Sequence, residues 1–229
     1  MTDLTNAIVL VTGANGGLGA EFVQQALDRG AAKVYVTART PRTWDDERIV
    51  PLALDVTSQE SVDAAARAAA DTTVLVNNAG IGGSAPLLDT SVDKVEHVFA
   101  TNVFGALRVA KAFAPSLRGG ALVDVHSVLS WIALAGGYSA SKAAFWSITN
   151  SLRLELAPQG TQVVGAHLGY TDTGMTADLD VEKADPADIV RTIWDAVEAG
   201  EHEVLADEVS RNVRAGLSAP LSALYPSLV

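Results

Sequence analysis

Short apolar runs rich in β-branched residues alternate along the chain with longer Ala- and Leu-rich stretches. Runs of this length, bounded by Gly, Asn or Asp, predict buried strands. They are AIVLVTG, KVYVTAR, IVPLALDV, TVLVNNAG, ALVDVHS, TQVVGAHLG and HEVLAD, which begin at residues 7, 33, 49, 73, 121, 161 and 202. The stretches between them carry a helical period and predict helices over 18–29, 59–70, 91–117, 138–157 and 186–199.

Strands that alternate with helices are typical of a parallel sheet covered on both faces. We therefore predict an α/β fold with a doubly wound parallel sheet of about seven strands and helices on both faces. No linker or low-complexity tract divides the chain, so residues 1–229 are expected to form a single dinucleotide-binding and catalytic domain. The polar segment 170–185 lacks a clear period and is the candidate for a mobile substrate loop.

The charge of the chain narrows its class of partner. The balance of 16 basic and 27 acidic side chains gives a net charge of -11, which argues against nucleic acid or an anionic membrane surface as the main partner. The chain has no cysteine and therefore no disulfide or thiolate ligand, and we expect no metal site. Because the N-terminus lacks a signal-peptide pattern and no apolar run approaches the roughly 20 residues of a membrane span, a cytoplasmic protein is expected.

The first candidate site is the loop TGANGGLG, residues 12–19, which lies between the first predicted strand and a helix. A Gly-rich turn at this place lets the backbone approach a pyrophosphate and points helix N-terminal amides at its charge. A plain strand-to-helix turn is the alternative. The position after the first strand of an alternating chain favours a dinucleotide site, formed by Gly13, Asn15, Gly17, Leu18 and Gly19.

The end of the second strand bears on the choice of cofactor. An NAD site usually offers an acidic residue there to the ribose hydroxyls, and this chain has Arg39. Arginine can pair with a 2′-phosphate through its planar fork, so NADP(H) is predicted to be preferred over NAD(H). An ordinary exposed arginine is the alternative.

Two further strand ends complete the predicted cofactor site. Asp55 and Val56, after the third strand, are expected to hold the adenine. The motif NNAG ends the fourth strand, and its Asn78, Ala79 and Gly80 are expected to lie along the cofactor. Asparagine after a strand is also a common turn former.

The stretch GGYSASKAAF, residues 136–145, sets Tyr138 four residues ahead of Lys142 in a predicted helix, where the two share a face. A free phenol has a pKa of about 10, too high for efficient proton exchange near neutrality, and a nearby ammonium lowers it. Such pairs are common on helix surfaces by chance, so the other motifs decide its meaning.

Together these motifs resemble the short-chain dehydrogenase/reductase family. TGANGGLG, NNAG, Asn102 in ATNVFG, Ser127 in VDVHSV and the pair Tyr138-x-x-x-Lys142 occur in the family's order between about residues 6 and 207. The resemblance implies a Rossmann-like fold and an NADP(H)-dependent oxidoreductase that interconverts a ketone or aldehyde and an alcohol. It implies that Tyr138 is the general acid and base and that Lys142 lowers its pKa and holds the nicotinamide ribose. By the same resemblance, Ser127 hydrogen-bonds the substrate oxygen and Asn102 supports a water that links Lys142 to solvent.

Some positions depart from the family pattern. Ser127 precedes the tyrosine by about two residues fewer than is usual, so the loop between them is shortened and Ser130 is a rival candidate. Gly16 occupies the position at which many NADP-dependent members carry a basic residue. The NADP(H) prediction therefore rests chiefly on Arg39.

After the sixth strand, Leu168 stands where the family tends to have proline. Gly169 and Thr173 still match the family, and Thr171 is expected where backbone meets the cofactor's carboxamide. We therefore expect the chain to bind the cofactor despite Leu168 in place of proline.

The substrate pocket is expected at the carboxyl edge of the sheet and is predicted to be apolar and partly aromatic. Its candidates are Ile81, His126, Leu129, Ser130, Trp131, Ile132, Tyr170 and residues 174–185. Trp131 and Ile132 could equally pack on the core. A small-molecule carbonyl or alcohol is the expected substrate.

The predicted helix 138–157 is apolar on more than one face, which favours a partner subunit on one side. The family's habit of pairing through this helix implies a homodimer or homotetramer. Two other functions are compatible with these motifs. One is a non-catalytic NADP(H)-sensing regulator of the same fold, and the other is a nucleotide-sugar epimerase or dehydratase, for which little chain remains beyond residue 207.

Overall fold

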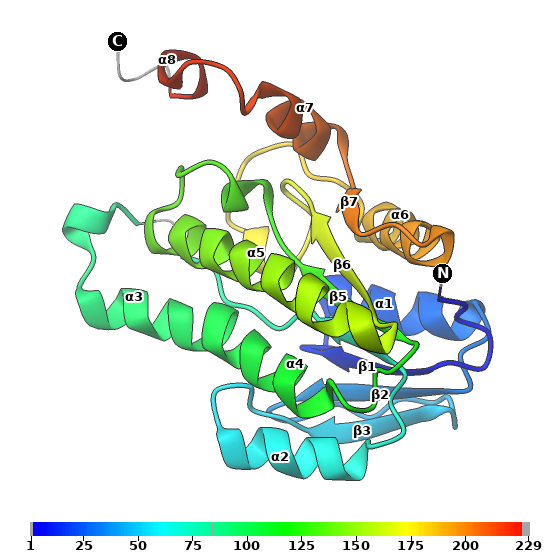
Figure 1. The fold of residues 1–229 in the computed structure, drawn as a ribbon. Coiled ribbons are helices and arrows are strands. Elements are labelled where there is room, and N and C mark those ends of the chain that lie inside the picture. The colour runs from blue at the N-terminus through cyan, green and yellow to red at the C-terminus, as the bar shows by residue number, and fades with distance from the viewer. Residues whose placement is uncertain (1, 84, 226–229) are drawn as a thin grey trace.

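Seven strands form one parallel sheet in the computed structural model, which describes residues 2–83 and 85–225 (Figure 1). The strands are β1 (Ile8–Thr12), β2 (Lys33–Ala38), β3 (Ile49–Ala53), β4 (Val74–Asn77), β5 (Ala121–Val125), β6 (Gln162–His167) and β7 (Glu203–Leu205). Their order is β3-β2-β1-β4-β5-β6-β7, and each pairing is parallel. The strand order reverses between β1 and β4, and such a switch point opens a crevice at the carboxyl ends of the strands.

Helices cover both faces of the sheet (Figure 1). The helices α1 (Gly17–Asp28) and α6 (Pro186–Ala199) pack on one face, where Phe22 meets Trp194 edge to face with ring centroids 5.4 Å apart. The helices α2 (Gln59–Ala68), α4 (Ala106–Phe113) and α5 (Gly136–Leu156) pack on the other. Val9 and Val11 of β1 join the first core and Leu10 the second, as the alternation of a strand requires. The predicted single-domain Rossmann-like α/β fold is confirmed.

The predicted helix 91–117 is not one continuous α-helix. It consists of α3 (Val92–Phe99), the π-helical segment η2 (Ala100–Gly105) and α4. A π-helical turn accommodates an extra residue without breaking the apolar stripe on either side, so the hydrophobic period does not reveal it. Gly105 ends the segment against the β3–α2 loop, where a Cβ atom would lie 2.8 Å from a methyl carbon of Val56. Segments of this kind are frequent at functional sites.

The segment 170–185 leaves the sheet after β6 and closes on itself. Asp172 N donates to Ala184 O at 3.0 Å, and Ala184 N donates to Tyr170 O at 2.8 Å. A short 3-10 turn, η5 (Gly174–Thr176), lies within it. The segment is therefore a loop whose two ends are hydrogen-bonded to each other. Its role as a substrate loop stays a prediction.

The C-terminal part forms α7 (Glu208–Gly216) and α8 (Leu221–Leu224), which lie at the top of Figure 1. The helix α7 contacts the 3-10 turn η3 (Val128–Ser130). After α8, the Tyr225 hydroxyl accepts a hydrogen bond from Ala133 N at 3.1 Å. Two more 3-10 turns are η1 (Leu87–Asp89) and η4 (Ala157–Gln159). Among the helices of the described chain, none has the length and apolar character that crossing a membrane requires.

Candidate active site

The glycine loop forms a close cradle at the start of α1. Gly13 and Gly17 have φ of 66° and 52°, in the left-handed region that glycine tolerates. A Cβ atom on Gly19 would lie 2.3 Å from Gly13 O, so only glycine fits there. The N-cap residue Gly16 offers no side-chain bond to the first-turn amides. The loop thus provides backbone amides and a helix N-terminus for an anionic group.

The predicted NNAG motif holds this loop in place. Asn78 Nδ2 donates to Thr12 O at 2.9 Å and to Gly13 O at 3.2 Å. The backbone amides of Asn78 and Ala79 both donate to Thr12 Oγ1 at 2.9 Å. Sequence reasoning missed Thr12, although a hydroxyl at the end of an apolar strand was a visible signal. The structure therefore brings the ends of β1 and β4 together, as predicted.

Arg39 follows β2 and is exposed at the same edge of the sheet. Asn15 ties the glycine loop to this segment, because its Nδ2 donates to Thr40 O at 2.8 Å and its Oδ1 accepts from Arg42 N at 3.2 Å. The Arg42 guanidinium lies 3.8 Å from the ring centroid of Trp44. Two arginines therefore follow the end of β2, where an NAD site would usually have an acid.

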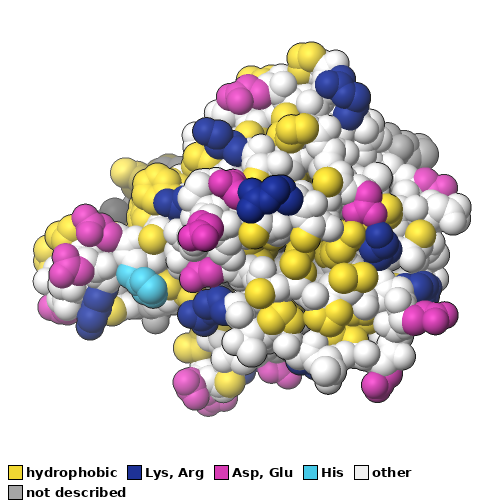
Figure 2. Space-filling model, turned by 90° about the horizontal axis from the view of Figure 1, so that it is seen from below, with side chains coloured by type: hydrophobic (Ala, Val, Ile, Leu, Met, Phe, Trp, Pro, Cys, Tyr) yellow, Lys and Arg dark blue, Asp and Glu magenta, His cyan; other side chains and the backbone are white. Residues whose placement is uncertain are grey.

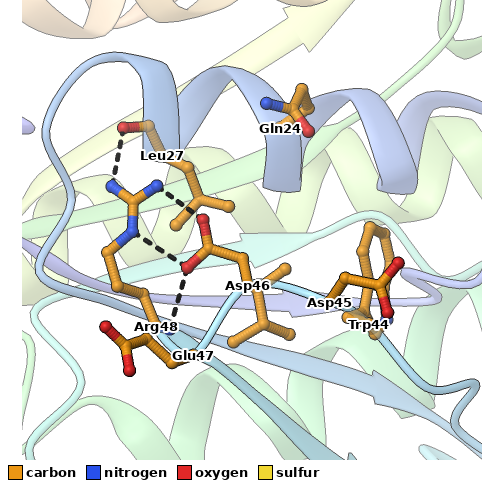
Figure 3. A pocket seen from close by; sticks show the side chains of 8 residues that line it. Gln24, Leu27, Trp44, Asp45, Asp46, Glu47 and Arg48 are labelled. Atoms are coloured by element: carbon orange, nitrogen blue, oxygen red, sulfur yellow. Dashed lines mark hydrogen bonds and ion pairs between the residues drawn. The ribbon is translucent and has the colours of Figure 1, made fainter.

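A cleft of about 800 Å³ lies behind this segment, between α1 and residues 44–49 (Figure 3). Arg48 anchors its wall, donating to Asp46 Oδ2 at 2.6 Å and to Leu27 O at 3.2 Å. Its lining includes Asp45, Asp46 and Glu47 and contains none of the predicted catalytic residues. We interpret the cleft as a structural feature behind the segment that carries Arg42, which Arg48 holds in place. It is not the active site.

Asp55 and Val56 occupy the turn after β3. The Asp55 carboxylate accepts from Thr57 N at 2.9 Å and from Thr57 Oγ1 at 2.7 Å. These hydrogen bonds, and to a lesser extent the charge of Arg39, hold the pKa of Asp55 below its usual value. Val56 is buried against Gly105. An adenine contact by these two residues stays a prediction.

The residues after β6 complete the edge of the cradle. Gly169 N donates to Asp207 Oδ2 at 2.6 Å, and a Cβ atom there would lie in tight contact with Val209, 3.1 Å from its Cβ atom. Thr171 is buried, and its hydroxyl has no hydrogen-bond partner within the described residues. A Cβ atom on Gly17 would lie 3.2 Å from the Thr173 side chain, so this segment closes over the glycine loop. The glycine cradle, the exposed arginines and the unpartnered Thr171 hydroxyl fit a phosphorylated dinucleotide.

Ser127 and Tyr138 lie at the carboxyl end of β5. The Ser127 hydroxyl accepts a hydrogen bond from Leu129 N at 3.2 Å, and Ser127 is the N-cap residue of η3. Burial raises the pKa of the Tyr138 phenol to about 12, and a hydrogen bond with Ser127 offsets part of the rise. The rival Ser130 is buried, and its hydroxyl has no partner within the described chain. Ser127 is therefore the serine beside Tyr138.

Lys142 lies one turn along α5 from Tyr138. Its Nζ donates to Val125 O at 2.8 Å and lies 5.8 Å from the centroid of the Tyr138 ring. Burial lowers the pKa of Lys142 to about 8, and the negative charge of Asp124 opposes that shift. Burial dominates the pKa of Tyr138 in this structure, and the lowering of that pKa by Lys142 stays a prediction.

Asn102 lies in the π-helical segment and joins three parts of the site. Its Oδ1 accepts from Ile81 N at 2.9 Å, and its Nδ2 donates to Ile81 O at 2.9 Å and to Ser141 Oγ at 3.2 Å. Gly80 lies directly beside it, since a Cβ atom there would be 3.3 Å from Asn102 Oδ1. Asn102 thus connects the NNAG turn to the residue before Lys142. Its role in holding a water stays a prediction.

A buried acid beneath the catalytic residues was missed from the sequence. Asp124 of β5 accepts from Asn77 Nδ2 at 3.0 Å and from Thr149 Oγ1 at 2.6 Å. Burial raises its pKa to about 6, and these two hydrogen bonds oppose the rise. A single charged residue in the apolar run ALVDVHS was the available signal.

Some of the predicted pocket residues pack in the core, and the others are exposed or half-buried. His126 is fully buried, stacked on His167 with centroids 5.0 Å apart, so its assignment to the pocket lining was wrong. Trp131 stacks on His167 at 4.0 Å, which favours the core-packing alternative. Tyr170 is exposed. Ile81, Leu129 and Ile132 are half-buried.

Comparison with known proteins gives consistent matches. A family model described as short chain dehydrogenase matches residues 7–184. Short-chain dehydrogenase cctT of Talaromyces islandicus is 38% identical over 179 residues, 72% of this chain and 63% of that protein, so this chain spans less than two thirds of it. An uncharacterized oxidoreductase of Staphylococcus aureus is 32% identical over 223 residues, 88% of this chain and 95% of that protein. A short chain dehydrogenase from Burkholderia cenocepacia, solved in complex with NADP, is 34% identical with a TM-score of 0.94, covering 100% of this chain and 99% of that one.

Proposed function

The chain belongs to the short-chain dehydrogenase family and is an oxidoreductase that uses a nicotinamide cofactor, and on this premise we propose the reaction that it catalyses. The proposed reaction interconverts a ketone or aldehyde and an alcohol by hydride transfer, with Tyr138 as general acid and base. The observation that carries the proposal is the convergence of Ser127, Tyr138 and Lys142 at the carboxyl end of β5, beside the glycine cradle. NADP(H), when bound, supplies or accepts the hydride.

Each side chain has a distinct part in this reaction. The Ser127 hydroxyl and the Tyr138 phenol bind the substrate oxygen, and the phenol donates its proton as that oxygen becomes an alcohol. Because burial raises the pKa of Tyr138 to about 12, the phenol keeps its proton near neutrality and is present as the acid form that a carbonyl reduction requires. The charged Lys142 side chain stabilises the phenolate that remains after transfer.

The preference for NADP(H) over NAD(H) belongs to the same proposal. It is supported by Arg39 and Arg42 at the end of β2 and by the NADP complex of the Burkholderia cenocepacia relative. Guanidinium groups bind a phosphate with paired, charge-assisted hydrogen bonds. Asn15 fixes the backbone that carries the two arginines beside the glycine loop, because it binds Thr40 O and Arg42 N.

We also propose that the chain forms a homodimer or homotetramer through α5 and its neighbours. Leu154 of α5 is 78% exposed and Phe104 of η2 is 51% exposed, on helices that lie side by side in Figure 1. Figure 2 views the molecule from the side on which α2 lies in Figure 1, and hydrophobic side chains gather in the middle of that face among acidic and basic ones. Exposed large apolar side chains on adjacent helices are typical of a subunit interface.

The test follows consumption of NADPH or NADH with a panel of alkyl and aryl ketones and aldehydes. Wild type should turn over with NADPH preferred, and Tyr138→Phe should lose about 10²- to 10⁴-fold in kcat/KM. Tyr35→Phe, in β2 where the hydroxyl bonds Asp71 away from the site, is the matched tyrosine control and should retain activity. Arg39→Ala should lower the preference for NADPH about tenfold, whereas Arg67→Ala on the exposed side of α2 should not.

Two results would contradict the proposal. Full activity in Tyr138→Phe would remove that residue as the general acid. Tight NADPH binding without turnover of any carbonyl would favour a cofactor-sensing protein instead of an enzyme of this reaction.

A further inference from the structure

A buried acid lies beneath the catalytic residues and has no part in the chemistry described so far. Asp124 is 0% exposed and lies in β5 between Val123 and Val125, which pack into the core under α1 and α6. Because strand residues alternate, the Asp124 side chain points to the opposite layer, between the sheet and α5. An ionised group in such a layer is costly unless it is paired.

The partners of Asp124 are neutral donors. Its Oδ2 accepts from Thr149 Oγ1 of α5 at 2.6 Å, and its Oδ1 accepts from Asn77 Nδ2 of β4 at 3.0 Å. Asn77 Nδ2 also lies 3.2 Å from Ala106 O, at the end of the π-helical segment. Hydrogen bonds donated to both oxygens favour the ionised carboxylate. The carboxylate is therefore held rigidly where β4, β5 and α5 meet.

Lys142 lies in the same layer. Its Nζ donates to the carbonyl oxygen of Val125, the residue that follows Asp124. Lys142 and Thr149 are separated by two helical turns and share the face of α5 that covers β5. The lysine is 7% exposed, so its ammonium has lost most of its hydration.

We propose that Asp124 is the buried counter-charge of Lys142, a positioning residue that keeps the lysine ammonium protonated beside Tyr138. Burial alone favours the neutral amine, and a carboxylate nearby opposes that effect, so the pKa of Lys142 stays at about 8, above neutrality. The direction of the interaction agrees, because Asp124 raises the pKa of Lys142 and Lys142 lowers that of Asp124. The inference rests on the proposed function only in that a charged Lys142 serves catalysis.

The other titratable groups around this layer do not replace Asp124. Arg153 of α5 is a second cation facing Asp124, and its guanidinium also binds Val163 O and His202 O. The imidazoles of His126, directly after β5, and of His167 on β6 are neutral, since burial lowers the pKa of both. Tyr138 is a protonated phenol. The Glu203 carboxylate of β7 raises the pKa of Arg153 and lies 3.9 Å from His167 Nε2.

The test is a titration of Lys142 itself by NMR on protein labelled at lysine Cε, in which the other signals come from Lys33, Lys94, Lys111 and Lys183. Asp124→Asn keeps the shape of the side chain and removes its charge. We expect the Lys142 midpoint to fall by about one pH unit or more, a tenfold loss of proton affinity. Thr149→Val keeps the carboxylate and removes one donor, and should move the midpoint by no more than about 0.3 units. Equal midpoints in wild type and Asp124→Asn would overturn the proposal.

A reciprocal measurement serves if Asp124→Asn does not fold. In protein labelled at aspartate Cγ, Lys142→Met should raise the Asp124 midpoint, because the two shifts are one interaction. An unchanged Asp124 midpoint would also overturn the pairing. Neither readout needs turnover, so a failure of the proposed reaction leaves this result standing. If the enzyme is active, the alkaline limb of kcat/KM should move down in Asp124→Asn by the same interval and stay in place in Thr149→Val.

Discussion

At the scale of single residues, burial is the largest influence on every titratable group around the catalytic pair. It raises the pKa of Tyr138 and Asp124 and lowers that of Lys142 and His167. All four shifts favour the neutral form, as expected for a dry layer between a sheet and a helix. Hydrogen bonds and charges reduce the shifts of Tyr138, Asp124 and Lys142 without reversing them, whereas nearby cations lower the pKa of His167 further. Protonation here is therefore sensitive to any change that admits water.

The effect of burial on the pKa of His167 can be measured through the pH dependence of the unfolding free energy. Burial lowers its pKa from 6.5 to about 4 in the folded protein, so below pH 6.5 the unfolded chain binds a proton that the folded protein does not. Stability is therefore lost as the pH falls from about 6.5 towards 4, by about 2 kcal/mol between pH 7 and pH 5. His167→Phe keeps a ring for stacking on Trp131 and removes the titration.

Urea unfolding at pH 7 and pH 5 tests this prediction. The loss of unfolding free energy on acidification should be smaller in His167→Phe than in wild type. The buried Asp124, which titrates in the opposite sense, is present in both proteins and cancels from the comparison. An equal loss in the two proteins would show that His167 is not kept neutral by folding.

At the scale of elements, the β1–α1 turn offers a matched pair of glycines. A Cβ atom on Gly19 would lie 2.3 Å from Gly13 O and 2.8 Å from Asn78 Nδ2, so Gly19→Ala must displace the turn. We expect a loss of about 1–3 kcal/mol in unfolding free energy. Gly16 has extended backbone, with φ of -175°, and no atom lies within 4 Å of the place that a Cβ atom would take, so Gly16→Ala should cost less than about 0.5 kcal/mol.

Urea unfolding of both variants without cofactor is the measurement, and NADPH titration of the folded variants is a second one. Gly19→Ala should also weaken NADPH binding, because the displaced turn is the cradle for the pyrophosphate. Equal stability of the two alanine variants would mean that the turn tolerates a side chain at residue 19.

The elements that were predicted well are those with a local signal. The strands are short apolar runs with turn residues at their ends, and parallel strands bring those ends to one edge, so Gly13, Asn78 and Ser127 could be placed together from the sequence. The π-helical segment around Asn102 leaves the apolar period intact on both sides and was missed. The burial of His126 and the pairing of Asp124 with Thr149 depend on how α5 packs on β5, which no local pattern specifies.

At the scale of the whole molecule, the net charge of -11 opposes association of identical chains, while apolar side chains exposed on α5 and η2 favour it. Salt screens the repulsion between like-charged subunits over about 10 Å at 0.1 M and hardly affects apolar contact. We therefore expect the proposed homo-oligomer to be more stable at physiological salt than at low ionic strength.

Light scattering measures the mass of the protein in solution and so tests whether it associates. Wild type should have a mass that is a multiple of 23.8 kDa at micromolar concentration and physiological salt. Leu154→Asp places a charge on the exposed face of α5 and should shift the mass towards the single chain, because burying an unpaired carboxylate in an interface is costly. Leu88→Asp is the matched control, since Leu88 is 100% exposed in η1 and lies outside the proposed helices. A wild-type mass of 23.8 kDa, or an equal effect of the two variants, would exclude α5 as the interface.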